Sequence, residues 1–277
     1  MSWKGFDGRR YTRDQFSAHV ANITIGPYAK FIVMHGTGQP TLKQWMEFPV
    51  PQRIANLQRY YENNLGWAHG PHLFIGPEND GIVGFSDLSV RGTHCSCWNG
   101  CSIGIETAGN WNIEDMNSGD GAAVRDNFVF AAAVLHKHLG LRPDGYIKGV
   151  RGLHFHRECA ADGHLECPQG IGGNLNKDDL VARILAAMDA MPLLAPNPDL
   201  VAQATKMPTD HLETHPRGSV AWVQDKLNAA GATPPLDVDG DFGVMTKGAV
   251  GQFQRAHSLT VDCIVGPATL AALDAVA

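Results

Sequence analysis

The sequence predicts an α/β fold with a central mixed sheet flanked by helices, followed by a small all-α domain of three helices. Short β-rich runs alternate with helical patterns up to residue 190, a proline-rich stretch follows, and a helical segment comes last. A chain in which strands and helices alternate usually forms a sheet from its strands, with the helices packed against that sheet. We therefore predict a first domain over residues 1–190, a linker over 191–216 and a second domain over 217–277.

The first domain takes its strands from three apolar runs. They are Phe31–His35, His72–Gly76 and Cys101–Glu106, each short and rich in β-branched or aromatic residues. Helical patterns lie between and after them, namely TLKQWM, PQRIANLQRYYENN, AAVRDNFVFAAAVLHKHLG and LVARILAAMDAM. This order predicts a sheet at the centre with helices packed on it.

Beyond residue 190, the stretch MPLLAPNPDLVAQATKMPTDHLETHPRG carries five prolines and no sustained apolar period, which predicts a semi-extended linker. In the tail, Val238–Gly243 with Thr246 recurs as Val261–Gly266 with Thr269. Each copy predicts a tight turn followed by a short helix. Apolar residues at helical spacing predict one more helix, which precedes the two copies of this motif.

The composition excludes several classes of function. The formal net charge of −6 provides no basic field to hold phosphates, so we expect no nucleic-acid partner. No apolar run is long enough to cross a bilayer, so we expect no membrane insertion. The segment MSWKGFDGRRYTRDQF lacks the apolar core of a secretory signal, and we expect synthesis in a cytoplasm. We also expect a monomer.

Six cysteines in a chain without an export signal favour thiols or metal ligands over a disulfide framework. We interpret Cys159 and Cys263 as small buried apolar residues. Cys95, Cys97 and Cys101 form a C-x-C-x3-C pattern, which allows a second metal site, a local disulfide or a reduced cluster. Of these three, the reduced cluster is favoured.

The stretch VRGLHFHRECAADGHLECPQG concentrates histidines and cysteines with little apolar periodicity. A catalytic zinc site needs three protein ligands and an open position for water, and imidazole and thiolate are suitable donors. His156 and Cys167 fit a strand end followed by a folded-back loop, and His35 ends a strand where α/β sheets place their sites. These three residues are the predicted ligands. His154 competes with His156, since both lie on one face of the run LHFH.

Together with the segments GTHCSCWN and CSIGIETAGNW, these residues resemble the zinc-dependent N-acetylmuramoyl-L-alanine amidases, a family that includes phage lysozyme-type amidases and peptidoglycan recognition proteins. The resemblance covers roughly Phe31 to Gly170 by motif. It implies that His35, His156 and Cys167 hold zinc, and it favours His156 over His154 because the residues H-R-E followed by H-x-x-C-P resemble the family's run. It also implies that Glu106 is the general base that activates the zinc-bound water.

Two positions depart from the family pattern. Many members have a lysine two residues before the last ligand, where this chain has Leu165, and we expect the neighbouring His164 to supply the missing donor. Other members have a tyrosine before the second core strand, where this chain has Pro71. The expected substrate contacts are His72, His94 and Asn99.

The tail resembles the peptidoglycan-binding module of many cell-wall hydrolases, with Cys263 where that family usually has a glycine. The two resemblances imply an enzyme that cleaves the amide between N-acetylmuramic acid and L-alanine, held on the wall by its tail. One alternative is a recognition protein that has lost the metal, but such loss usually replaces the cysteine ligand, and Cys167 is present. Another is a zinc peptidase of the H-E-x-x-H type, a pattern that this sequence does not contain.

The favoured origin is a phage or prophage endolysin, which is made in the host cytoplasm and acts on the wall after release. A bacterial amidase of wall recycling or autolysis is the other origin that the sequence allows.

Overall fold

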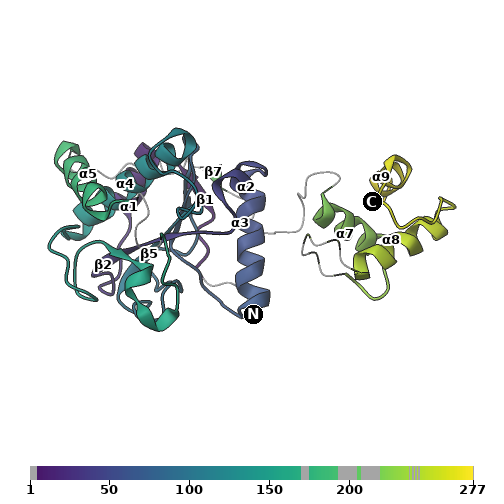
Figure 1. Cartoon of the computed structure of the whole chain (residues 1–277), viewed down its shortest axis with the longest axis horizontal. Coiled ribbons are helices and arrows are strands. Elements are labelled where there is room, and N and C mark those ends of the chain that lie inside the picture. Colours follow the sequence, from purple (N-terminus) through teal and green to yellow (C-terminus); the bar gives the residue numbers. More distant parts are fainter. Residues whose placement is uncertain are drawn as a thin grey trace. The chain divides into compact units, whose positions relative to one another are not determined.

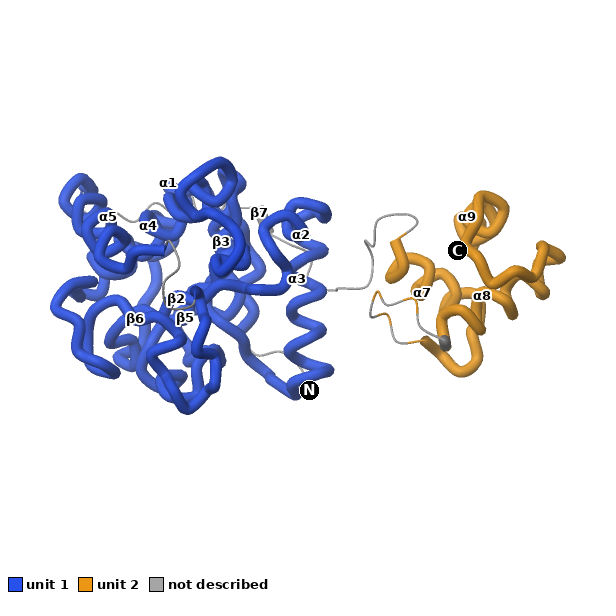
Figure 2. Tube along the Cα trace, viewed as in Figure 1, with its two compact units in different colours: residues 1–209 blue, residues 210–277 orange. Residues whose placement is uncertain are grey.

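The computed structural model describes residues 5–169, 175–192, 205–206, 219–236, 238, 240, 242 and 244–276. Contacts divide the chain into two compact units, residues 1–209 and 210–277 (Figure 2). None of the described helices combines the length and apolar character that crossing a membrane requires.

Within the described residues, a seven-stranded sheet forms the centre of the first unit (Figure 1). Its order is β6-β2-β5-β3-β4-β1-β7, and the strands are β1 (Arg9–Tyr11), β2 (Phe31–Gly36), β3 (Leu73–Ile75), β4 (Ile82–Gly84), β5 (Ser102–Thr107), β6 (His154–Phe155) and β7 (Thr205–Lys206). Strands β6, β2, β5 and β3 are parallel, whereas β4, β1 and β7 are antiparallel to their neighbours. The predicted mixed sheet is confirmed, and β2, β5 and β3 are its three predicted strands.

Helices cover both faces of this sheet. The helices α1 (Arg13–Asn22), α4 (Gly119–Leu139) and α5 (Lys177–Ala190) share one apolar core with β2 and β5. The helices α2 (Leu42–Met46) and α3 (Val50–Arg59) belong to a second apolar cluster, in which Trp45 and Ile54 pack with Phe74 and Phe85. The sheet therefore lies between two layers, as the alternation of strands and helices predicts.

Alternation along the central strands decides which side chains face the site. Ile32 and Met34 enter the core beneath α4, so Val33 and His35 project to the opposite face of β2. Strand β5 pairs with β2 in parallel register, with Glu106 opposite His35. Both polar side chains therefore reach the same face, at the carboxyl ends of neighbouring strands.

The predicted boundary of the first domain at residue 190 needs correction. Thr205–Lys206 form β7 and pair with β1, and the first compact unit extends to Thr209. Most other residues of the predicted linker lie outside the described residues. An edge strand is held by backbone hydrogen bonds, so a short polar segment joins a sheet without any apolar period in its sequence.

A disulfide joins Cys97 to Cys159, which corrects both the predicted reduced cluster and the free, buried Cys159. The two cysteines are 62 positions apart in the sequence, and only the packing of their loops brings the sulfurs together. The free cysteines are Cys95, Cys101, Cys167 and Cys263.

Replacing Cys97 with serine is expected to lower the free energy of unfolding of the first unit by about 2–4 kcal/mol, because the crosslink restricts the unfolded chain. Denaturant unfolding without reductant measures the change. Cys101→Ser is the matched control, since Cys101 packs against the same apolar cluster as Cys159 but is free. An unchanged unfolding midpoint in Cys97→Ser would contradict the crosslink.

In its described residues the second unit is the predicted three-helix domain. Helices α7 (Val220–Ala229), α8 (Val244–Ala256) and α9 (Pro267–Asp274) contribute to a core of their own. Gln224 of α7 is buried, and its amide nitrogen donates to Thr246 Oγ1 at 3.0 Å. Its amide oxygen accepts from the Gly240 backbone N–H at 2.9 Å. One side chain thus ties a turn to the helix that follows it.

The second copy of the repeated motif makes the same contacts. Gln254 of α8 is buried, donates to Thr269 Oγ1 at 3.0 Å and accepts from the Cys263 backbone N–H at 2.9 Å. Cys263 has a φ of 57°, in the left-handed region that favours glycine. The sequence repeat is therefore also a structural repeat, and the glycine expected at this position is explained by its backbone conformation.

Candidate metal and active site

The first unit contains a pocket of about 990 Å³ at the carboxyl ends of β2 and β5. Its lining includes the strand ends with His35 and Glu106, the end of α3 with the π-helical turn η1 (Tyr60–Asn64), and the loop of residues 163–168. Open α/β sheets place functional sites at this edge. The pocket is therefore the candidate site.

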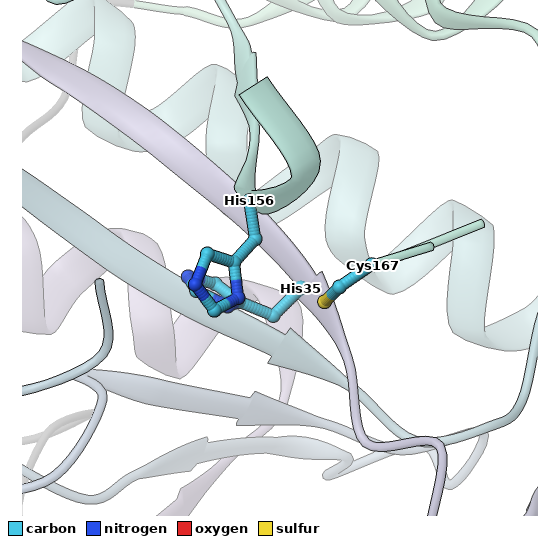
Figure 3. Close-up of side chains that lie close together, drawn as sticks. All are labelled: His35, His156 and Cys167. Carbon is cyan, nitrogen blue, oxygen red and sulfur yellow. The ribbon is translucent and has the colours of Figure 1, made fainter. Parts of the chain in front are cut away.

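The three predicted metal ligands converge in this pocket (Figure 3). His35 lies at the end of β2, His156 begins the short helix η2 (His156–Glu158) after β6, and Cys167 lies in a later loop. Their donor atoms are all within 4.8 Å of one another, and the two Nδ1 atoms are 3.0 Å apart. One ion can contact all three side chains.

Asp162 fixes the tautomer of His156. Burial opposes the charge of this carboxyl group, but hydrogen bonds from Ser96 and His156 outweigh it and lower the pKa of Asp162 to about 2. Its Oδ2 lies 2.9 Å from His156 Nε2. Because a carboxylate only accepts, Nε2 carries the proton and Nδ1 keeps its lone pair toward Cys167 and His35.

A chain of hydrogen bonds orients His35 in the same way. The Ser102 hydroxyl donates to the Trp98 carbonyl at 2.8 Å, so its oxygen is free to accept from His94 Nε2 at 3.3 Å. His94 Nδ1 then accepts from His35 Nε2 at 3.0 Å. His35 Nδ1 is left unprotonated. Partners of this kind set the tautomer and orientation of metal-binding histidines.

The charge states of the three side chains suit metal binding. Burial lowers the pKa of His35 and His156, and neighbouring histidines lower that of His35 further, so both imidazoles are neutral. Burial raises the pKa of the Cys167 thiol, so a metal must displace its proton. Two nitrogens and one sulfur, with space in the pocket for a further ligand, match the donor set of catalytic zinc.

The structure decides between the two competing histidines. His154 is fully buried, its Nδ1 donates to the Gly152 carbonyl at 2.9 Å, and its Nε2 accepts from the Gly149 N–H at 2.8 Å. Its ring stacks on Phe31. Both nitrogens are occupied, and among the described residues His154 joins no group of possible metal ligands. His156 is the candidate ligand.

Glu106 lies in the pocket wall next to the three ligands. Its Oε1 is 3.7 Å from His35 Nδ1, and its side chain is 13% exposed. Burial raises the pKa of Glu106 to about 8. A carboxyl group with a raised pKa, within reach of a metal centre, suits proton transfer near neutral pH.

His164 also lines the pocket. Its ring centroid is 4.7 Å from that of His156, and the side chain is exposed. This position allows it to donate a hydrogen bond to a bound group, and its catalytic role stays a prediction.

The structure corrects two of the expected substrate contacts. His72 is fully buried, with Nδ1 accepting from a backbone N–H at 3.1 Å and Nε2 lying 3.0 Å from a backbone carbonyl. The side-chain oxygen of Asn99 accepts from two backbone N–H groups at 2.7 Å and so holds a turn together. Neither residue is among the described residues that line the pocket.

The third expected contact, His94, does line the pocket, but its ring nitrogens face other protein groups. They contact His35 and Ser102, and the side chain is almost fully buried. The structure therefore gives His94 the role of orienting His35, in place of the predicted contact with substrate.

Asp162 and Tyr61 also belong to the site, although the sequence did not predict them there. Asp162 stands between two predicted ligands in the sequence, and an acid near a metal-binding histidine is a signal that could have identified it. Tyr61 lies in a helical pattern, where no local signal marks it as part of a pocket.

Replacing Asp162 with asparagine is expected to weaken zinc binding about 10–100-fold, because the amide holds His156 less firmly in its metal-binding tautomer. Competition with a colorimetric chelator measures the affinity. Asp144→Asn is the control, since Asp144 is an exposed acid paired with Arg142. Equal affinities in Asp162→Asn and the unmodified protein would contradict the assigned role.

Comparisons with known families identify both units. Residues 26–170 match the family model described as N-acetylmuramoyl-L-alanine amidase, and residues 216–273 match the model described as a putative peptidoglycan binding domain. The amidase match covers slightly more than half of the 277 residues.

Several characterised proteins resemble parts of the chain. Peptidoglycan-recognition protein SC2 of Drosophila melanogaster is 32% identical over 117 residues, which are 42% of this chain and 56% of that protein. Peptidoglycan-recognition protein SC1a of the same fly is 26% identical over 150 residues, which are 53% of this chain and 71% of that protein. The chain thus spans little more than half the length of SC2.

Solved structures show similar partial matches. The endolysin N-acetylmuramoyl-L-alanine amidase LysCS of Clostridium intestinale matches with a TM-score of 0.42 and 20% identity, over 59% of this chain and 92% of that chain. Drosophila PGRP-LB matches with a TM-score of 0.37 and 22% identity, over 60% and 83%.

The amidase match includes the strand ends and the loop that bring His35, Glu106, His156 and Cys167 together. This chain belongs to the N-acetylmuramoyl-L-alanine amidase family and carries a C-terminal peptidoglycan-binding domain.

Proposed function

We propose that this chain is a zinc-dependent amidase that cleaves the bond between the lactyl group of N-acetylmuramic acid and L-alanine in peptidoglycan. The observation that carries the proposal is the convergence of two neutral histidines and a cysteine beside Glu106, in one pocket of an amidase-family domain. Bound zinc lowers the pKa of water and polarises a carbonyl group.

His35, His156 and Cys167 would hold the ion, and the protein prepares two of them in advance. Asp162 keeps Nδ1 of His156 unprotonated, and the hydrogen bonds through His94 do the same for Nδ1 of His35. Both Nδ1 atoms are directed at one point. Little reorganisation is therefore needed when the ion binds.

The reaction adds water across the amide. The water oxygen bonds to the carbonyl carbon, the C–N bond breaks, and one water proton passes to the leaving nitrogen. Glu106 would take this proton and return it to the alanine nitrogen, and its Oε1 atom, 3.7 Å from His35 Nδ1, supports this role. The products are a carboxylate on the muramic acid and a free amino group on L-alanine.

We also propose that the second unit binds peptidoglycan and raises the concentration of the hydrolase at its substrate, which the match of residues 216–273 supports. A hydrolase joined to a wall-binding domain suits attack on intact wall. We therefore propose a phage or prophage endolysin that acts after release from the host cytoplasm. Expression in a bacterial host tests this: we expect lysis only after the membrane is permeabilised, and secretion of the protein by growing, unlysed cells would contradict it.

The bond specificity is tested on purified cell wall, with and without a chelator. We expect new L-alanine amino groups, which mass spectrometry identifies. Their formation should stop when the chelator is present and resume when zinc is added back. Release of reducing sugar ends without new L-alanine amino groups would overturn the proposed function.

A further inference from the structure

Tyr61 lies where the helix α3 changes into the π-helical turn η1. Such turns are rare, and they occur frequently at functional sites. The turn contributes Tyr60 and Tyr61 to the wall of the pocket that also contains Glu106 and Cys167.

Aromatic contacts hold the ring of Tyr61 in one orientation. It stacks on Trp67 with the ring centroids 5.2 Å apart, and it meets the ring of Phe85 edge-on at 5.9 Å. The Trp67 backbone N–H also donates to the Tyr61 carbonyl at 2.8 Å. The direction of the phenol is therefore set before any substrate binds.

The side chain of Tyr61 lines the same pocket as Glu106 and Cys167. Burial raises the pKa of Tyr61, and the charge of Glu106 raises it further, so the phenol keeps its proton. Within the described part of the chain, no hydrogen-bond partner occupies this hydroxyl. Nearby Pro71 lines the same pocket without any side-chain or backbone donor.

We propose that Tyr61 is a further catalytic residue, whose hydroxyl donates a hydrogen bond to the substrate carbonyl oxygen as negative charge develops there. This inference rests on the proposed amidase function. When water adds to the carbonyl carbon, the C=O electron pair moves onto the oxygen, and a donor already in place stabilises that charge. A phenol is protonated at neutral pH and so is a donor throughout the reaction.

Tyr61→Phe tests the proposal, because it removes only the hydroxyl and keeps the ring contacts with Trp67 and Phe85. We expect kcat for L-alanine release to fall about 10²–10³-fold, as for other lost donors of this kind, with KM nearly unchanged. Zinc content and the thermal unfolding midpoint should equal those of the unmodified protein.

Tyr146→Phe is the matched control. Tyr146 is 42% exposed and is not among the described residues that line the pocket. We expect its kcat to change less than about threefold, since an exposed hydroxyl exchanges with water at little net cost.

Three outcomes would overturn the inference. A kcat in Tyr61→Phe equal to that in Tyr146→Phe would show that the hydroxyl is not used. A loss of zinc or of thermal stability in Tyr61→Phe would show a structural role. If the unmodified protein releases no L-alanine amino groups from the wall, the proposed function fails and this inference fails with it, whereas the first two outcomes leave the proposed function intact.

Discussion

Cys167→Ser is expected to remove tight zinc binding and to lower amide hydrolysis on the order of 10³-fold. The thiolate is the only sulfur among three donors that lie within 4.8 Å of one another. A serine hydroxyl stays neutral and is a poorer zinc ligand than a thiolate. The ion contributes several kcal/mol to the stabilisation of the transition state, and about 4 kcal/mol corresponds to this factor.

Elemental analysis for zinc and the rate of L-alanine release measure the two effects of Cys167→Ser. Cys101→Ser is the matched control, because Cys101 is also a free cysteine and does not line the pocket among its described residues. A Cys167→Ser protein that keeps one zinc per chain and full activity would remove Cys167 from the ligand set. If both variants lose activity equally, the loss does not come from the site.

Glu106→Gln is expected to lower kcat about 10²–10⁴-fold while the protein keeps its zinc. Glutamine has nearly the same shape as glutamate but cannot take a proton from water. Glu106 is close to the candidate ligands, with Oε1 3.7 Å from His35 Nδ1, yet it does not belong to the set of possible metal ligands found among the described residues. Proton transfer should therefore be lost without loss of the ion.

Steady-state kinetics on wall fragments, together with zinc analysis, check this prediction. Glu166→Gln is the matched control, since Glu166 lines the same pocket but is exposed. Activity of Glu106→Gln within a few-fold of the unmodified protein would exclude Glu106 as the general base. Loss of zinc from this variant would instead point to a structural role at the metal site.

The candidate metal ligands could be predicted because their signals are local and chemical. Imidazole and thiolate are the side chains that bind zinc, and His35 stands at the end of an apolar strand. Strand β2 and strand β5 were also predictable, since short β-branched runs differ from the longer helical patterns around them.

The predictions that the structure corrected were wrong for a common physical reason. His72 and Asn99 are polar residues near the predicted site, but their polar atoms bond to the backbone, and a sequence does not show which polar groups are satisfied in this way. The disulfide between Cys97 and Cys159 was missed for a related reason, because its partners come from loops far apart in the chain.

By itself, the sequence determined three central strands, most of the helical segments and the residue types that can hold a metal ion, and the family resemblance added Glu106 beside them. Only the tertiary structure decided between His154 and His156. It also supplied Asp162 as the partner of His156 and His94 as the partner of His35, and it brought Tyr61 into the pocket. The physical reason is that residue chemistry and periodicity are properties of short segments. Tautomers, burial and the direction of a hydroxyl depend on groups that the fold brings together from distant segments.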